Sequence, residues 1–403
     1  MLAMNGNHGP AERPRRLADE RIASALKRRG AVLVCGPKGC GKRAAALKAC
    51  GARFSWDDDG GARELAALLD ASDAPVLVEG WQSDAQRWDD TARAVLETGR
   101  TGRAVMTCDG EPFGGGRHAA HARAIARIDV GPLSSLETGL SDGSFSVARL
   151  LDISGIADDG YETAPGVDER RLAEALIRGG LFDGRGGVAD MPSFNGEEGL
   201  FAGGIARFSG ELATNLAICR SLTPSPDEDV RLRFAAFQER LVNGRVLGSR
   251  PNWRPTKLLE SRFSCLPRRY FCDPSLAAAA LGVDGAAALL ADKGLLAKLF
   301  KTLVMRDVSA YAAMHDLAVF RYDDKDGMQF DLVLERGSQW CAAAVVVDPE
   351  DVEPTAQRLV RTAQYLEGYR TPKPCSLTVI SGPGSCGTVL NGVRVIPFDR
   401  LGA

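Results

Sequence analysis

The sequence predicts an α/β protein whose N-terminal part is built on a parallel sheet. Three apolar runs, at 31–35, 75–79 and 103–107, have the length and composition of buried strands. Helical patterns at 43–52 and 64–69 lie between these runs. Strands that alternate with helices pair in parallel and are covered by helices on both faces, so we expect an α/β domain of this kind at the start of the chain.

The 403 residues are enough for two or three domains. Residues 1–16 are polar and contain glycine and proline, which predicts a disordered N-terminus. The turn-rich stretch 53–61 predicts a connection, and the glycine-rich stretch 184–204 predicts a linker. An amphipathic helix is expected at 230–241, followed by a turn and wing at 243–257.

The C-terminal third has the pattern of a second, mixed α/β unit. It begins with a long helix at 295–314 and contains a second helix at 352–369. The expected strands lie near 317–322, 328–335, 340–347, 376–380 and 392–396.

Composition excludes several classes of protein. The net charge of −2 and the pI of about 6.2 give no support for a nucleic-acid-binding field. No apolar run approaches the roughly 20 residues of a membrane span, and the start has no signal-peptide core. The ten cysteines form no CxxC pair, which favours reduced thiols and a cytoplasmic location. His118 and His121 lack further ligands nearby, so no metal site is expected.

A glycine-rich loop follows the first strand and precedes a helix, as a phosphate-binding loop requires. Glycines let backbone N–H groups surround an anion, and a lysine at the helix start reaches the terminal phosphates. The next position normally holds Ser or Thr for Mg²⁺, but here it is Arg43. The predicted nucleotide-binding residues are Gly36, Pro37, Lys38, Gly39, Cys40, Gly41, Lys42 and Arg43.

Two later strand ends supply candidate partners for this loop. Glu79 closes the strand at 75–79, where an acid holds Mg²⁺ in P-loop proteins, although such an acid is also often a solvated edge or a helix cap. We predict Glu79 as the catalytic residue. Thr107 closes the next strand and is a candidate γ-phosphate sensor, with β-propensity as the alternative reason for its presence. Gly80 has no side chain to orient an attacking water.

Motifs along the chain resemble those of prokaryotic AAA-type P-loop ATPases that carry the domain of unknown function 4143. The resemblance begins at about residue 21 and ends near 401. Its residues are the loop Gly36 to Lys42, Gly80-Trp-Gln82 with Trp88, Pro132-Leu-Ser134 with Glu137-Thr-Gly139, Arg178-Gly-Gly180, Phe271-Cys-Asp-Pro-Ser-Leu-Ala277, Leu299-Phe300 and Val304-Met-Arg-Asp307.

This resemblance implies three parts. An AAA-type P-loop domain would cover 17–180, a linker with a helical, winged-helix-like region 181–275, and a restriction-endonuclease-like α/β domain 276–403. A nuclease site of that type needs a helix Glu, an Asp on one strand and a Glu-x-Lys on the next. In this chain Lys301 replaces the Glu, Asp331 is kept, and the third motif is 344–346, Ala-Val-Val. Lys301 is expected to repel a metal ion or to pair with Asp331, so nuclease activity is not expected.

Three hypotheses about function follow. The first is an ATP-binding protein with weak or absent hydrolysis and an uncertain need for Mg²⁺, because Arg43 and Gly80 replace catalytic side chains. The second is a non-catalytic scaffold or regulatory protein in which both the nucleotide site and the nuclease site have decayed. The third is DNA binding through the middle domain, which the near-neutral charge does not support. The sequence names no protein partner.

Overall fold

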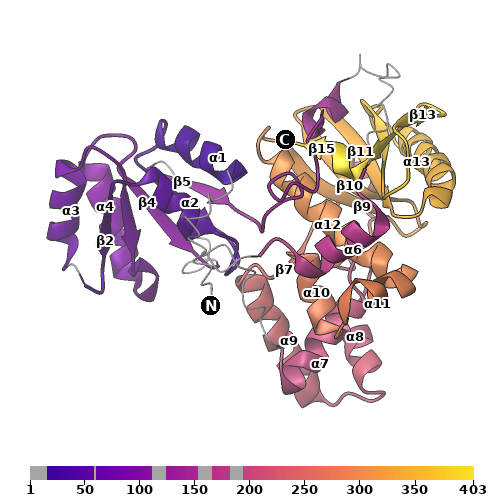
Figure 1. Ribbon diagram of the computed structural model, residues 1–403, viewed down its shortest axis with the longest axis horizontal. Coiled ribbons are helices and arrows are strands. Elements are labelled where there is room, and N and C mark those ends of the chain that lie inside the picture. The colour runs from indigo at the N-terminus through magenta and orange to yellow at the C-terminus, as the bar shows by residue number, and fades with distance from the viewer. Residues whose placement is uncertain (1–15, 59, 111–123, 153–165, 182–193) are drawn as a thin grey trace, which may run out of the picture.

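The computed structural model describes residues 16–58, 60–110, 124–152, 166–181 and 194–403, and Figure 1 shows the arrangement of its elements. Two separate sheets define an α/β protein, with a helical region between them in the sequence. The expected disordered segment 1–16 lies outside the described residues except for Arg16, which is buried and therefore corrects that prediction at its last position.

The first sheet is parallel and has five strands in the order β2-β3-β4-β1-β5. All five residues of the central strand β1 are buried, as expected for a parallel sheet covered on both faces. The predicted strands at 31–35, 75–79 and 103–107 are confirmed as β1, β3 and β4. The strands are β1 Ala31–Cys35, β2 Ala52–Ser55, β3 Val76–Glu79, β4 Ala104–Cys108 and β5 Ile125–Asp129.

Helices cover both faces of this sheet. Side chains of α1 Leu17–Leu26 and α2 Lys42–Ala49 share one core cluster with Val32 and Val34 of β1. Side chains of α3 Ala62–Ala71 and α4 Ala85–Glu97 share a second cluster with Ala31 and Leu33. This alternation along β1 is the period of two that places successive strand residues on opposite faces.

The prediction of a turn-rich connection at 53–61 was wrong at its start, because β2 Ala52–Ser55 pairs with β3 at the edge of the sheet. Only Phe54 and Ser55 are buried in this strand. A four-residue edge strand with a charged residue and no continuous apolar run has almost no periodic signal.

The middle region contains α6 Glu169–Arg178, α7 Gly196–Arg207, α8 Asn215–Leu222 and α9 Glu228–Asn243. An antiparallel pair, β7 Leu247–Ser249 with β8 Arg269–Phe271, follows α9. The helix predicted at 230–241 is confirmed as part of α9. Between the two strands lies the short 3₁₀ helix η3 Lys257–Leu259.

The predicted linker at 184–204 was wrong in its second half, because α7 begins at Gly196, whereas residues 182–193 lie outside the described chain. A Cβ atom on Gly203 would lie 3.1 Å from the carbonyl oxygen of Ala280, and one on Gly204 would lie 3.1 Å from Ile218. These glycines therefore let α7 approach its neighbours closely. The same composition that is typical of a linker serves helix packing here.

The C-terminal sheet is mixed and has the order β13-β14-β12-β11-β10-β9. Side chains of α12 Lys293–Ala312 pack with one face, and those of α13 Val352–Glu367 pack with the other. The helices and strands predicted for this third of the chain are confirmed, with ends shifted by a few residues. The strands are β9 Ala318–Asp323, β10 Gln329–Arg336, β11 Gln339–Val346, β12 Leu377–Ser381, β13 Thr388–Leu390 and β14 Val393–Pro397.

Residues 132–152 and 166–180, expected with the first sheet, also contact the C-terminal part. The strand β6 Phe145–Ser146 pairs with β15 Leu401–Gly402, and η2 Val147–Leu151 contacts β11 and α12. α6 packs against α10 Pro274–Ala280, α11 Gly285–Ala291 and α12. The remaining 3₁₀ helices are η1 Trp81–Ser83, η4 Pro349–Asp351 and η5 Phe398–Arg400.

No single helix in the described ranges is long and apolar enough to cross a membrane. α10 and α11 have the length and composition of a membrane span only when they are taken together, and this pair is bent by 88°.

Candidate functional site

The predicted phosphate loop connects β1 to α2 at the carboxyl edge of the first sheet. Gly39 and Gly41 have φ angles of +81° and +77°, a conformation that glycine adopts without the strain of a Cβ atom. A Cβ on Gly36 would lie 2.2 Å from the carbonyl oxygen of Val130. No side chain caps α2, whose N-cap is Gly41. Its first N–H groups have no partner within the helix and point outward from a positive helix end.

Lys42 lies at the start of α2 and is nearly buried. Its ammonium group donates to the carbonyl oxygen of Pro37 at 3.2 Å and pairs with the carboxylate of Asp109, which directly follows β4. Thr107, in the same strand β4, pairs in register with Val34 of β1. Lys42, at the start of α2, and Thr107, near the end of β4, therefore both lie at the carboxyl ends of the central strands.

Glu79 does not point to an open metal position. Its carboxylate accepts hydrogen bonds from Arg43 Nε at 2.7 Å and from Arg43 Nη2 at 3.3 Å, and it also pairs with Arg53 of β2. The hydrogen bond from Arg43 lowers the pKa of Glu79, against the opposing effect of burial. Two guanidinium groups therefore neutralise the carboxylate predicted to be catalytic. Within the described ranges, no group of three or more acidic, His or Cys side chains is placed to hold a metal ion.

The backbone conformation at position 80, directly after Glu79, requires a glycine. Its φ angle is +74°, and an added Cβ would lie 2.8 Å from a carboxylate oxygen of Asp57. Asp57 in turn pairs with Arg87 at 2.6 Å. The motif residues Trp81 and Trp88 are both buried, with ring centroids 5.1 Å apart, so they belong to the core of the first domain.

Arg16 is a functional candidate that the sequence prediction missed, because it was placed in the disordered N-terminus. It is 5% exposed. Its guanidinium donates to the carbonyl oxygen of Cys40 at 2.6 Å, to that of Gly131 at 3.0 Å and to the carboxylate of Glu137 at 2.8 Å. One arginine thereby connects the phosphate loop with the segment after β5. The only sequence signal for this role is its position immediately before α1.

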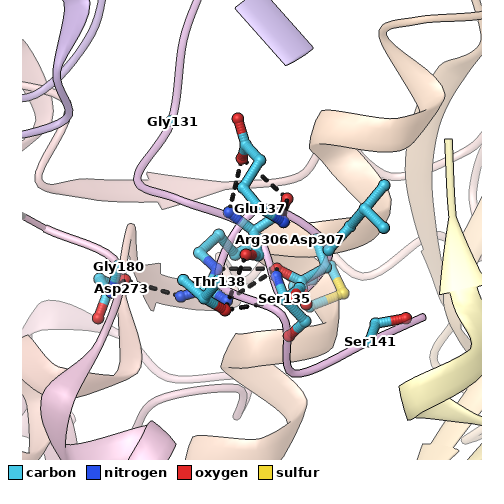
Figure 2. A network of polar contacts seen from close by, with 12 residues as sticks. Gly131, Ser135, Glu137, Thr138, Ser141, Gly180, Asp273, Arg306 and Asp307 are labelled. Carbon is cyan, nitrogen blue, oxygen red and sulfur yellow. Dashed lines mark hydrogen bonds and ion pairs between the residues drawn. The ribbon is translucent and has the colours of Figure 1, made fainter. Parts of the chain in front are cut away.

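Four of the motifs that carry the family resemblance meet in one buried network, shown in Figure 2. The backbone N–H of Ser135 donates to Asp307 at 3.2 Å, and that of Gly180 donates to Asp273 at 2.9 Å. Arg306 of α12 pairs with both carboxylates at 2.9 Å. Burial raises the pKa of Asp307, while the neighbouring guanidinium opposes this shift. The network fixes the segment after β5 onto α12 and the start of α10.

The residues predicted to form a degenerate nuclease-like site, Lys301 and Asp331, lie in a cluster of paired charges. Lys301 of α12 and Asp331 of β10 form the expected ion pair at 2.8 Å. Arg268 also contacts Asp331, at 3.2 Å, and pairs with Asp323. The backbone N–H of Val345 donates to the other oxygen of Asp331 at 3.0 Å. Burial favours the neutral acid, but Lys301 and Arg268 outweigh this effect and lower the pKa of Asp331.

Comparison of the chain with models of protein families and with curated proteins gives no match in either case. All ten cysteines lie within the described ranges and are free thiols. His118 and His121 lie outside those ranges.

Substitution of Gly180 tests how tightly the buried network is packed. A Cβ on Gly180 would lie 2.2 Å from the carbonyl oxygen of Leu133, a backbone atom that cannot move aside alone. We expect Gly180→Ala to lower the free energy of unfolding by about 2 kcal/mol, as overpacking does. Gly131→Ala is the matched control, because a Cβ there meets nothing within 4 Å. Equal midpoints of urea denaturation for both variants would contradict this interpretation.

Substitution of Asp331 tests how much the charge cluster contributes to stability. Asp331→Asn leaves Lys301 and the buried Arg268 without this carboxylate, so we expect a loss of about 3 kcal/mol in the free energy of unfolding at neutral pH. Lys293→Met, which removes an exposed pair on the same helix, should change it by less than about 0.5 kcal/mol.

The pH dependence of unfolding provides a second measurement on Asp331. Because folding lowers the pKa of Asp331, its stabilising contribution is complete above its ordinary pKa of 3.8 and is lost as the pH falls through the lower, folded value. The difference in stability between wild type and Asp331→Asn should therefore shrink below about pH 4. A difference that stays constant into the acid range would contradict the paired role.

Proposed function

We propose that the chain binds ATP at the loop of residues 36–43 and hydrolyses it slowly or not at all. The observation that carries the proposal is the position of Lys42, held at the N-terminus of α2 above a loop with two glycines at positive φ. Open N–H groups, a positive helix end and a lysine together form an anion site suited to a triphosphate. In our proposal Thr107 lies beside the terminal phosphate.

The proposed lack of turnover rests on the environment of Glu79. Arg43 stands where a hydroxyl would hold Mg²⁺, and it engages the carboxylate that would support that ion. Hydrolysis of nucleoside triphosphates depends on the metal to neutralise charge on the β- and γ-phosphates. In our proposal the exposed guanidinium of Arg43 supplies part of that positive charge, so nucleotide binding does not require Mg²⁺.

We also propose membership of the AAA-type family named above, with a winged-helix-like middle and a nuclease-like C-terminal domain. In support, four separate motifs of the resemblance contact one another in the buried network of Figure 2. Helices α7 to α9 followed by the β7–β8 pair have the element order that a winged helix needs. The mixed C-terminal sheet lies between α12 and α13. In our proposal the Lys301–Asp331 pair marks the position of a lost nuclease site.

A non-catalytic scaffold or regulatory protein is the second candidate. Two ion pairs favour this candidate, Arg43 with Glu79 and Lys301 with Asp331. In this proposal each pair stands where an ancestral protein bound a metal ion. In that case the loop would keep its shape without a ligand. The two candidates differ in whether wild-type protein binds ATP.

Calorimetric titration with ATP, with and without Mg²⁺, tests the proposal. We expect saturable binding in both conditions and loss of about tenfold or more in affinity for Lys42→Ala, because a charge-assisted contact to phosphate is removed. Lys48→Ala is the control on the same helix, since Lys48 pairs with Asp19 away from the loop. No binding to wild type at millimolar ATP would favour the scaffold. Steady ATPase activity that is lost in Glu79→Gln would contradict the assigned role of the Arg43–Glu79 pair.

Asp109 provides an independent test of the same site. Its carboxylate pairs with Lys42 and must give up that contact when phosphate arrives, although its side chain is 67% exposed. We expect Asp109→Asn to raise the affinity for ATP by about tenfold, because a competing anion is removed from the lysine. Asp73→Asn, in the connection before β3 at the opposite edge of the sheet, should leave the affinity unchanged. An unchanged or lower affinity in Asp109→Asn would show that Lys42 does not contact the phosphates.

A further inference from the structure

A cavity of about 460 Å³ lies between the first sheet, the middle region and α12. Its walls come from α1 and the end of β5, from the segment between α9 and β8, and from α12. Small-molecule sites commonly enclose about 300–1,000 Å³, so the cavity has room for a small organic ligand. The cavity is separate from the outer face of the phosphate loop. Pro37 is the only residue of that loop that lines the cavity.

The charged part of the cavity wall is predominantly cationic. Five arginines line it, compared with two carboxylates, those of Asp129 and Glu137. The arginines are Arg16, Arg21, Arg245, Arg250 and Arg306.

Two of these arginines have carboxylate partners of their own. Arg16 pairs with Glu137 at 2.8 Å, and Arg306 pairs with Asp273 and Asp307 at 2.9 Å. These pairs belong to the buried network and hold the walls in place. They are not available for a ligand without a loss of stability.

The wall around Asp129 retains positive charge. Arg245 and Arg127 share the single carboxylate of Asp129, at 2.7 and 3.2 Å. Arg21 donates to the backbone carbonyl oxygen of the same residue at 2.8 Å. Three guanidinium groups thus lie around Asp129, and Asp316 is a second carboxylate near Arg21.

Arg250 differs from the other four arginines. Its guanidinium donates to the hydroxyl oxygen of Ser309, and that hydroxyl donates to the carbonyl oxygen of Met305. Across the described chain, no carboxylate pairs with Arg250. Burial lowers the pKa of Arg250, and the neighbouring Tyr270 opposes this shift only in part. A guanidinium has five N–H donors in a fork that fits phosphate or carboxylate, and most of these donors remain for a ligand.

The cavity also has an apolar side. Leu247, Phe271 and Met305 line it and are all nearly buried. A ligand that fills the space must therefore combine an anionic group with an apolar body.

We propose that this cavity binds a small organic phosphate, with its phosphoryl group on Arg250 and its apolar body against Leu247, Phe271 and Met305. A phosphate monoester carries close to two negative charges at neutral pH, which suits Arg250 in a wall with five arginines and two carboxylates. The site is distinct from the phosphate loop and does not depend on the function proposed for that loop.

Calorimetric titration with phenyl phosphate, in a buffer free of phosphate and Mg²⁺, tests the proposal. We expect saturable binding to wild type and about tenfold weaker binding to Arg250→Gln, because one charge-assisted contact is lost. Arg250→Lys should recover part of the affinity, since the charge returns without the fork. Arg254→Gln is the matched control, because Arg254 is exposed and contacts the ring of Phe263 outside this cavity.

Further measurements separate the alternatives. Lys42→Ala should bind phenyl phosphate as wild type does, and a loss of binding in this variant would place the ligand at the phosphate loop and overturn the proposal. Thermal unfolding of Arg250→Gln should match that of wild type, which shows that weaker binding is not a folding defect. Unchanged affinity in Arg250→Gln, or no binding to wild type at millimolar concentration, would overturn the proposal. So would displacement of phenyl phosphate by single-stranded DNA with a steep salt dependence, because the cavity would then be part of a nucleic-acid surface.

Discussion

The carboxylate of Glu137 connects the two halves of the molecule. One of its oxygens accepts from Arg16 Nε and from the backbone N–H of Leu17, and the other accepts from the N–H and hydroxyl of Ser134. Four donors offset the cost of removing this charge from water, which a single partner would not do. The same segment is held on its other side by Tyr311 of α12, whose hydroxyl accepts from the N–H of Leu136. The first sheet is thereby fixed to the C-terminal part through one short stretch of chain.

Local periodicity predicted the C-terminal third and the centre of the first sheet, because those elements are long or fully buried. Several elements were not predicted, among them the edge strands β2 and β5 and the helix α7. In α7 the glycines serve contacts with Ala280 and Ile218, which lie in other elements and leave no trace in the local pattern. The attachment of residues after 131 to α12 depends on pairings more than 170 positions apart, such as Ser135 with Asp307, which no local window contains.

Candidate site residues were predictable to the extent that their chemistry follows from strand order. The loop and Lys42 follow from a strand, glycines and a helix in sequence, and the ion pair of Lys301 with Asp331 was expected. The second partner of Asp331, Arg268, was not, since it immediately precedes β8 and lies outside the C-terminal sheet. Arg53 reaches Glu79 only because β2 pairs with β3, so a missed strand concealed half of that interaction.

Cations pair with Glu79 and with Asp331, the two carboxylates that we predicted at former metal positions, and stability alone accounts for this pairing. A buried carboxylate needs a positive partner, because an unpaired buried charge costs several kcal/mol. Lys301 with Arg268 meets this need at the buried Asp331, whereas Arg43 and Arg53 pair with Glu79 at a partly exposed position. Such pairs say little about a present ligand. The informative cations are those with a weak or absent protein partner: Lys42, whose partner Asp109 is largely exposed, and Arg250, which donates to a neutral hydroxyl. We infer that ligands bind at these two positions.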